Sequence, residues 1–210
     1  GGIENMMGKR EANSGIEKYR VEALTDGVFA FAMTLLVMNI EVPESLPVHM
    51  SEEAVRGVLA GLAPDVMHYA VAFAVLAGFW MIHHSVFEHI KHLNRNMVWM
   101  NIAPLLFVAL LPFSTQFAET HVDSPTSALV FEANIFAIGA LYWAQWLYAC
   151  RDRKHLVPGV SEAHLRKGMF GMAIMPALSL VAMMIALMGF TWSAMLYLLT
   201  PLLYMLLKRA

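Results

Sequence analysis

The sequence predicts an all-α integral membrane protein with six transmembrane helices per chain. Of its 210 residues, 59% are hydrophobic and 14% are charged, whereas a soluble domain usually has about 25% charged residues. Six apolar runs follow one another between short polar breaks, and a helix needs about 20 such residues to cross a bilayer. Basic residues gather in alternate breaks. Together these observations favour a multi-pass membrane protein over a soluble one.

The runs differ in the residues that interrupt or end them. Pro43 ends the first run, and Ser51 in the polar stretch that follows is placed to cap a short helix at the membrane rim. The third run contains Pro104 and Pro112, and proline inside a membrane helix usually produces a kink. Only a short turn near Thr191 separates the last two runs, which predicts an antiparallel hairpin. The expected spans are residues 21–42, 64–90, 97–118, 126–150, 168–190 and 192–207.

The basic residues predict the orientation. Cytoplasmic segments of membrane proteins carry an excess of Lys and Arg, and six spans place all but Arg56 on the side of both termini. We therefore expect a multi-pass protein of the cell membrane with both termini in the cytoplasm. The basic residues on that side are Lys9, Arg10, Lys18, Arg20, Lys91, Arg95, Arg151, Arg153, Lys154, Arg166, Lys167, Lys208 and Arg209.

The chain divides into a tail and one membrane domain. Residues 1–19 are expected to form a disordered cytoplasmic tail, and residues 20–210 the six-helix domain. The tail is polar and lacks the apolar core of a signal peptide, and its leading Gly1 and Gly2 resemble residues left by cloning. Cys150 is the single cysteine, which excludes a disulfide framework. The net charge of −2 gives no reason to expect a nucleic-acid partner.

An acidic residue lies near the start of the first predicted span. Asp26 falls inside or at the edge of the apolar run, with Arg20 nearby. Ionisable groups at membrane depth are costly unless they are paired or hydrated. Asp26 could cap the helix in water at the interface, or join a buried polar junction with His83 or His84 beside Trp80. A neutral His can hydrogen-bond to both an acid and a carbonyl.

Further along the first span, an apolar stripe follows one helix face. Phe31, Leu35 and Met38 recur at the spacing of that face, and Thr34 borders it. A stripe of this kind packs against another helix or against lipid more often than it lines a pore. Spacing alone therefore leaves its role open.

The tract RVEALTDGVFAFAMTLLV, residues 20–37, is the most specific pattern in the chain. It closely resembles the first-helix signature of the transmembrane protein 175 family, the lysosomal potassium channels and their prokaryotic relatives. The resemblance covers most of residues 20–118, and the length of the chain suits a prokaryotic member with one six-helix repeat. Similar positions continue in Phe79-Trp80, His83-His84, Asn101 and the tract Leu110-Leu111-Pro112-Phe113.

The resemblance implies a homotetramer in which four first helices surround a central cation pore. Apolar rings that constrict the pore in the family correspond here to Phe31, Leu35 and Met38, and a Thr implicated in potassium preference corresponds to Thr34. Apolar rings gate by dewetting, whereas hydroxyl and carbonyl oxygens replace part of an ion's hydration shell. The implied function is a potassium-permeable channel with no cofactor beyond the permeating ions. Its implied partners are other copies of the chain, monovalent cations and the lipid bilayer.

The resemblance also implies a hydrogen-bonded knot that braces the pore helix. Carried over to this chain, the knot comprises Arg20, Asp26, Trp80 and one of His83 or His84. Two departures from the family pattern stand in the first helix. The bulky Phe31 replaces the usual Ile at the main constriction, which affects pore width, and Leu24-Thr25 replaces the commoner Phe-Ser pair.

Other classes of function fit the residues less well. A proton-coupled transporter could use Asp26 and a His of the second span as a relay, but the chain lacks the internal repeats and broken helices common in transporters. A haem or metal protein needs ligands on facing helices, and the last four predicted spans contain no His. No enzyme is expected, because no span combines a nucleophile, a base and an orienting group at helical spacing.

Overall fold

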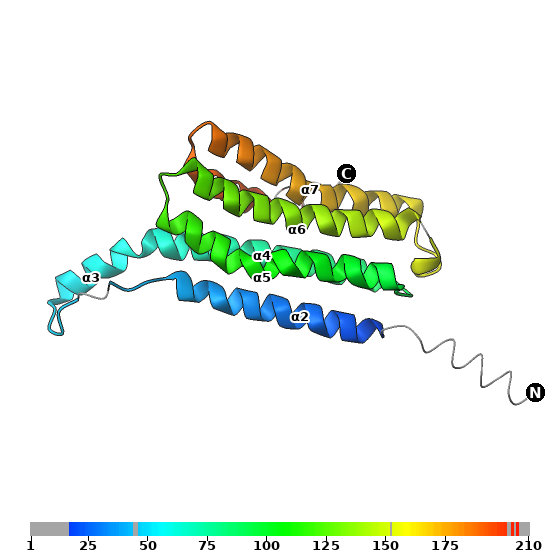
Figure 1. Cartoon of the computed structure of the whole chain (residues 1–210), viewed down its shortest axis with the longest axis horizontal. Coiled ribbons are helices and arrows are strands. Elements are labelled where there is room, and N and C mark those ends of the chain that lie inside the picture. The colour runs from blue at the N-terminus through cyan, green and yellow to red at the C-terminus, as the bar shows by residue number, and fades with distance from the viewer. Residues whose placement is uncertain (1–16, 44–45, 152, 201–202, 204, 206–210) are drawn as a thin grey trace, which may run out of the picture.

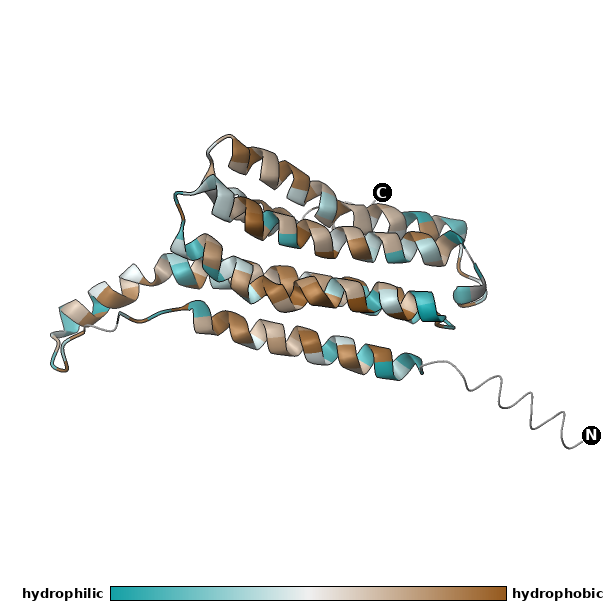
Figure 2. Cartoon of the chain, viewed as in Figure 1, coloured by the Kyte–Doolittle hydropathy of each residue, from teal (hydrophilic) through white to brown (hydrophobic). Residues whose placement is uncertain are grey.

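The computed structural model describes residues 17–43, 46–151, 153–200, 203 and 205. In this part of the chain, five helices are long and apolar enough to cross a membrane, and they lie side by side in a bundle (Figure 1). Apolar residues cover much of the length of these helices (Figure 2). The five are α2 (Lys18–Leu35, extended by the 3-10 helix η1, Leu36–Asn39), α4 (Ala63–His89), α5 (Arg95–Thr120), α6 (Pro125–Arg151) and α7 (Glu162–Leu187).

The all-α membrane fold predicted from the sequence is thus confirmed for five spans, and the sixth stays a prediction. The described part of that last segment is the 3-10 helix η3 (Thr191–Leu199), and several residues between 201 and 210 lie outside the described residues. The chain turns back at Gly189, whose φ is +91°. Because Tyr197 then reaches Ser179 of α7 with a hydrogen bond, η3 and α7 form the expected hairpin.

The helix starts follow local capping chemistry. The Ser51 hydroxyl accepts a hydrogen bond from the Ala54 amide at 3.2 Å and opens α3 (Glu52–Gly61), the rim helix expected from the sequence. A capping side chain also starts α5 and α7, where Asn94 and Ser161 accept from backbone amides in the first turn. No residue of α3 is buried, and this helix projects beyond the bundle (Figure 1).

The first span differs in its limits from the expected residues 21–42. Its α-helix begins at Lys18, inside the expected tail, and gives way to η1 at Leu36. Residues 1–16 lie outside the described residues, so the rest of the tail prediction stays a prediction.

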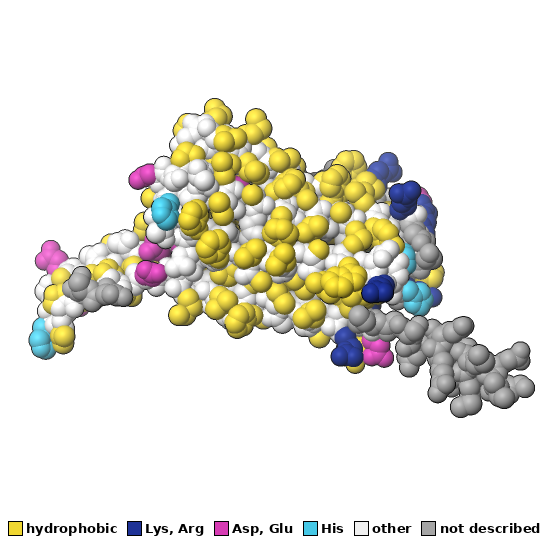
Figure 3. All heavy atoms as spheres, in the orientation of Figure 1, with side chains coloured by type: hydrophobic (Ala, Val, Ile, Leu, Met, Phe, Trp, Pro, Cys, Tyr) yellow, Lys and Arg dark blue, Asp and Glu magenta, His cyan; other side chains and the backbone are white. Residues whose placement is uncertain are grey.

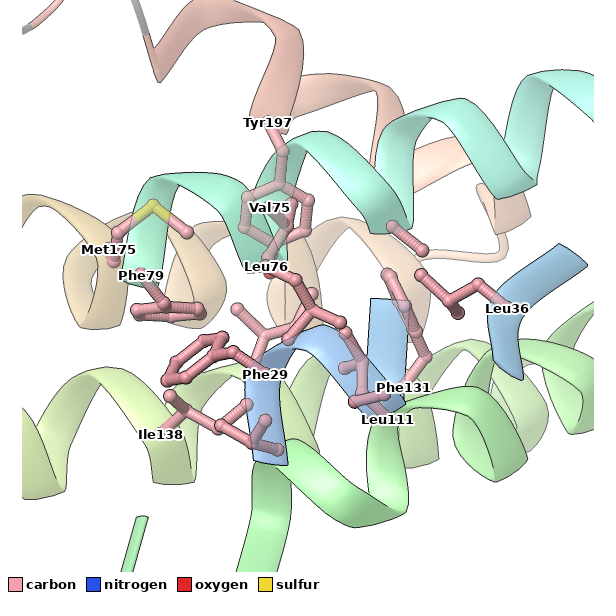
Figure 4. Close-up of a cluster of buried hydrophobic side chains, with 14 of the residues drawn as sticks. Phe29, Leu36, Val75, Leu76, Phe79, Leu111, Phe131, Ile138, Met175 and Tyr197 are labelled. Carbon is pink, nitrogen blue, oxygen red and sulfur yellow. The ribbon is translucent and has the colours of Figure 1, made fainter. Parts of the chain in front are cut away.

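Apolar side chains from all five long helices meet in the middle of the bundle (Figure 4). A second apolar cluster lies toward the end at which α2 begins, around Phe87, Met97 and Trp146. The helices α6 and α7 come so close that a Cβ atom added at Gly139 would lie 2.9 Å from the Pro176 ring. The side chains labelled in the close-up are Phe29, Leu36, Val75, Leu76, Phe79, Leu111, Phe131, Ile138, Met175 and Tyr197.

Basic side chains gather at one end of the bundle. On the face shown in Figure 3, Lys and Arg side chains lie at the end where α2 begins, whereas acidic and His side chains occur at both ends. The flank between them is mostly hydrophobic, as expected of a surface in contact with lipid.

Candidate functional site

The helix α2 has one face packed on its own bundle and another that is open. Phe29 and Leu36 are 1% and 0% exposed, whereas Phe31 and Met38 are 66% and 71% exposed. Leu35 belongs to the open side as well, at 37%. The packed face recurs every three to four residues, as one side of a helix does. It consists of Val21, Thr25, Phe29, Ala32 and Leu36.

A shallow apolar groove runs between the open face of α2 and the helix α5. Phe31 and Leu35 line it from α2, and Ala109 lines it from α5. Small residues at its other end, Ala23 and Gly27, keep the groove open close to the backbone. The predicted constriction residues therefore lie on a surface that a single copy of the chain leaves uncovered.

Thr34 lies on the same open face. Its hydroxyl donates to the backbone carbonyl of Phe31, with 2.8 Å between the two oxygens. Because the hydroxyl hydrogen is donated within the helix, the lone pairs of the exposed oxygen remain free to interact with groups outside the helix, such as a cation.

Two of the residues predicted for the polar knot are in direct contact. The Trp80 indole Nε1 donates a hydrogen bond of 2.8 Å to Asp26 Oδ1 and so ties α4 to α2. Trp80 also stacks on the ring of His84, with 5.9 Å between ring centroids, and His84 lies 3.4 Å from Glu88. Asp26, Trp80 and His84 are all exposed, so this contact lies on the flank of the bundle.

His83 takes part in a separate and fully buried network. Its Nε2 lies 2.8 Å from Asn101 Oδ1, and Asn101 Nδ2 donates to the Thr25 hydroxyl at 2.8 Å. Thr25 in turn donates to the Val21 carbonyl at 2.9 Å. Because the Asn101 oxygen can only accept, the hydrogen of His83 must be on Nε2. One amide thus joins α2, α4 and α5.

Arg20 is the predicted knot residue that the structure does not bring to the others. Its side chain is exposed and makes no hydrogen bond or ion pair with another described residue. Lys18 instead fixes the start of α2, because its ammonium donates to the Phe87 carbonyl at 2.5 Å and lies 3.9 Å from Glu22. The contributions of Lys18, Thr25 and Asn101 to this anchorage were not expected from the sequence. The signals available in the sequence were the amide of Asn101 inside an apolar run and the match of Asn101 to the family pattern.

Comparison with known proteins gives this chain its family. The model of the family described as endosomal/lysosomal potassium channel TMEM175 matches residues 20–112. A potassium channel of Chamaesiphon minutus is 31% identical over 144 residues, which cover 66% of this chain and 69% of that protein. The chain belongs to the TMEM175 family. The recognition made from the first-helix tract is confirmed.

Other TMEM175 relatives match different shares of the chain. A potassium channel of Streptomyces collinus is 34% identical over 135 residues, 60% of this chain and 64% of that protein. The rat endosomal/lysosomal proton channel TMEM175 is 31% identical over 183 residues, 82% of this chain but 37% of that protein. The chain therefore spans less than two thirds of the length of these two relatives. All three named relatives are channels and not enzymes, in agreement with the sequence prediction.

Solved structures extend the likeness to the whole TMEM175 fold. The crystal structure of a lysosomal potassium-selective channel TMEM175 homologue from Chamaesiphon minutus superposes with a TM-score of 0.72 at 25% identity, covering 92% of this chain and 98% of that one. A variant of the potassium channel MtTMEM175 gives a TM-score of 0.62 at 16% identity. The shared fold thus includes α6 and α7, which lie beyond the tract that the family model matches.

Proposed function

We propose that this chain is one subunit of a homotetrameric, potassium-permeable channel of the cell membrane, with both termini in the cytoplasm and a central pore lined by α2. The observation that carries the proposal is the open face of α2, where Phe31 and Met38 are exposed although the helix is anchored along its other side. Four copies around an axis would bring these faces together. The named activity of the bacterial relatives supports potassium as the ion.

In this proposal the open face carries both gate and selectivity. Rings of Phe31, Leu35 and Met38 would form dry constrictions that a hydrated cation passes only after the helices move. The exposed Thr34 oxygen, whose hydrogen is already donated within the helix, would replace part of the hydration shell of potassium. Thr34 therefore acts on ion preference and the apolar rings on total flux.

The buried contacts behind α2 would hold the pore helix in place. Asn101 fixes it to α4 and α5 through His83 and Thr25. Asp26 and Trp80 form a second attachment on the exposed flank, where a neighbouring subunit would cover it. Arg20 is exposed on the same helix and would find its acceptor in that neighbour.

The alternative of a proton-coupled transporter is less well supported. Its relay requires proton exchange between Asp26 and a His of α4. Asp26 instead accepts from Trp80, and His83 bonds to Asn101, so no hydrogen bond joins Asp26 to a His among the described residues. The named relatives are also channels.

The test is ion flux from liposomes that contain the purified protein, measured separately for potassium, sodium and caesium. Wild-type protein should pass potassium, and Phe31→Ala should raise that flux because it removes the bulkiest ring. Phe170→Ala is the matched control, since Phe170 is similarly exposed, at 61%, but lies on α7. This control should leave flux unchanged.

Two results would contradict the proposal. Absence of flux for every ion in both wild type and Phe31→Ala would remove the channel function. Equal flux in a well-folded Phe31→Ala protein and the wild type would show that this side chain does not limit the pore. The assembly is tested independently by chemical cross-linking in the membrane, where four linked chains are expected and a dimer would exclude the tetramer.

A further inference from the structure

A cavity of about 40 Å³ lies at the end of the bundle away from the basic residues, and outside the proposed pore. Its walls come from α4, α5, α6 and η3, and α2 contributes nothing to it. Exposed Val122 and Trp192 lie at its mouth, whereas the buried Glu132 and Ser193 lie at its base. None of these residues belongs to the proposed gate or to its anchorage.

The cavity is polar enough to hold water. Glu119 Oε1 and His68 Nδ1 face away from solvent and have no hydrogen-bond partner among the described residues, although both residues line the cavity. Buried polar atoms in proteins are almost always hydrogen-bonded, and a water needs roughly 10–15 Å³ of such space with two to four polar partners. The volume therefore suits about three waters, which would serve these two orphaned atoms.

Glu132 at the base of the cavity has a chain of hydroxyl partners. Its Oε1 accepts from the Ser193 hydroxyl at 2.8 Å, and its Oε2 is bonded to the Tyr197 hydroxyl. Tyr197 continues to Ser179 at 3.1 Å, and Ser179 donates to the Met175 carbonyl at 2.9 Å. These bonds link α6 to η3 and α7 at a carboxyl that is 0% exposed.

The hydrogen count allows one further proton in this chain. Tyr197 has a single hydroxyl hydrogen and two oxygen neighbours. With Glu132 ionised, Tyr197 donates to the carboxylate, and the Ser179 hydroxyl turns away from the Met175 carbonyl to donate to Tyr197. With Glu132 protonated, the acid donates to Tyr197, Tyr197 donates to Ser179, and Ser179 donates to the Met175 carbonyl, while Ser193 still donates to Oε1. Both arrangements leave every oxygen bonded, so the proton can come and go without breaking the attachment.

The surrounding charges are few. No Lys or Arg forms an ion pair with Glu132 in the described part of the chain, and the other titratable groups around the cavity are Glu119 and His68, with Asp65 of α4 close enough to act on both. A carboxyl without a cation at membrane depth is costly to retain, so such groups usually have a function.

We propose that this cavity is a hydrated proton-binding site, separate from the pore, in which Glu132 takes its proton from the solution at the end of the bundle opposite the basic residues. A hydronium ion in the cavity gives its proton to Glu132 Oε2 and leaves as water. The proton reverses the direction of the hydrogen bonds from Glu132 to Ser179. The acidity of that solution thereby sets which of the two arrangements holds η3 against α6 and α7.

The test is infrared difference spectroscopy of the full-length protein in liposomes, recorded between acidic and alkaline buffers. The wild type should show the carbonyl band of a protonated carboxyl that Glu132→Gln loses. Tyr197→Phe should keep this band but shift its frequency, because the acid loses its phenolic partner. Glu53→Gln is the control, because it identifies the band of an exposed carboxyl on α3. Tyr197→Phe should leave the frequency of this Glu53 band unchanged.

Access is tested by a rapid pH jump on Val122→Trp, which places a large side chain at the exposed mouth. The Glu132 band should then appear several times more slowly than in the wild type. A Glu132→Gln spectrum identical to the wild type would overturn the site. An unshifted carbonyl band in Tyr197→Phe would also overturn it, and this second variant provides the test if Glu132→Gln does not fold. An unchanged rate in Val122→Trp would overturn the route. None of these readouts requires ion flux, so they stand apart from the test of the channel.

Discussion

Replacing Asn101 with Leu removes the amide that joins α2 to α4 and α5 while keeping the side chain close to its original size. Two hydrogen bonds are lost, those to His83 and to Thr25. Interhelical hydrogen bonds within membranes contribute about 0.6–1.7 kcal/mol each. The variant should therefore be less stable than the wild type by about 1–3 kcal/mol, and the loss should concern chiefly the attachment of α2.

Part of this cost comes from His83, which is 2% exposed and would keep an N–H without an acceptor. The double variant His83→Phe with Asn101→Leu removes both partners, and replacing both by apolar groups can be nearly neutral. We expect it to be more stable than the sum of the two single changes predicts.

The measurement is the unfolding midpoint of the purified protein in detergent, for both single variants and the double variant. Asn96→Leu, at an exposed position of the same helix, is the matched control and should leave the midpoint unchanged. Equal midpoints for wild type and Asn101→Leu, or strictly additive losses in the double variant, would refute the assignment of this amide as the buried link.

Three further results are expected. Gly139→Ala should destabilise by about 1–3 kcal/mol in the same assay because its Cβ overlaps a proline ring of α7, whereas Gly78→Ala, with open space around it, should not; equal effects would contradict the close packing. A cysteine at Val157 in a Cys150→Ser chain should react with an impermeant reagent only from the cytoplasmic side, and labelling from outside would reverse the topology. Thr34→Val should change the potassium-to-sodium flux ratio more than total flux, and an unchanged ratio would remove Thr34 from selectivity.

The bilayer makes the long helices easy to predict. Each span needs an apolar run of fixed length, and Ser51 shows that even the short rim helix can be located from its cap. The last segment is harder, because hydropathy reports burial in lipid or protein without distinguishing a membrane α-helix from the 3-10 helix described at Thr191–Leu199.

The orientation of α2 about its own axis could not be read from composition. Phe29 and Phe31 are identical in type and two residues apart, yet one is packed on the bundle and the other is open. Only the resemblance to a known family indicated that Phe31 belongs to the open face. Pairing across helices was only partly predicted. Asp26 and Trp80 are in contact as expected, whereas Arg20 makes no contact with them, and the partners of Asn101 became known only from the structure.

Glu132 illustrates the same difficulty. An acidic residue inside an apolar run was visible in the sequence, but its importance depends on Ser193 and Tyr197, which follow it by more than sixty positions. A contact over such a separation has no local signal, because helical periodicity describes only neighbours within one helix.

The separation of the two faces of α2 has a consequence for how such a protein can evolve. Residues such as Phe29 and Leu36 must remain compatible with the subunit's own core, so changes there reduce the yield of folded chains. Phe31 lies outside that core, so in the proposed channel a change there acts only once subunits assemble. On this proposal a lineage can vary the pore surface while keeping the same subunit core, and Phe31, where the resemblance implies an Ile, would be one such variation.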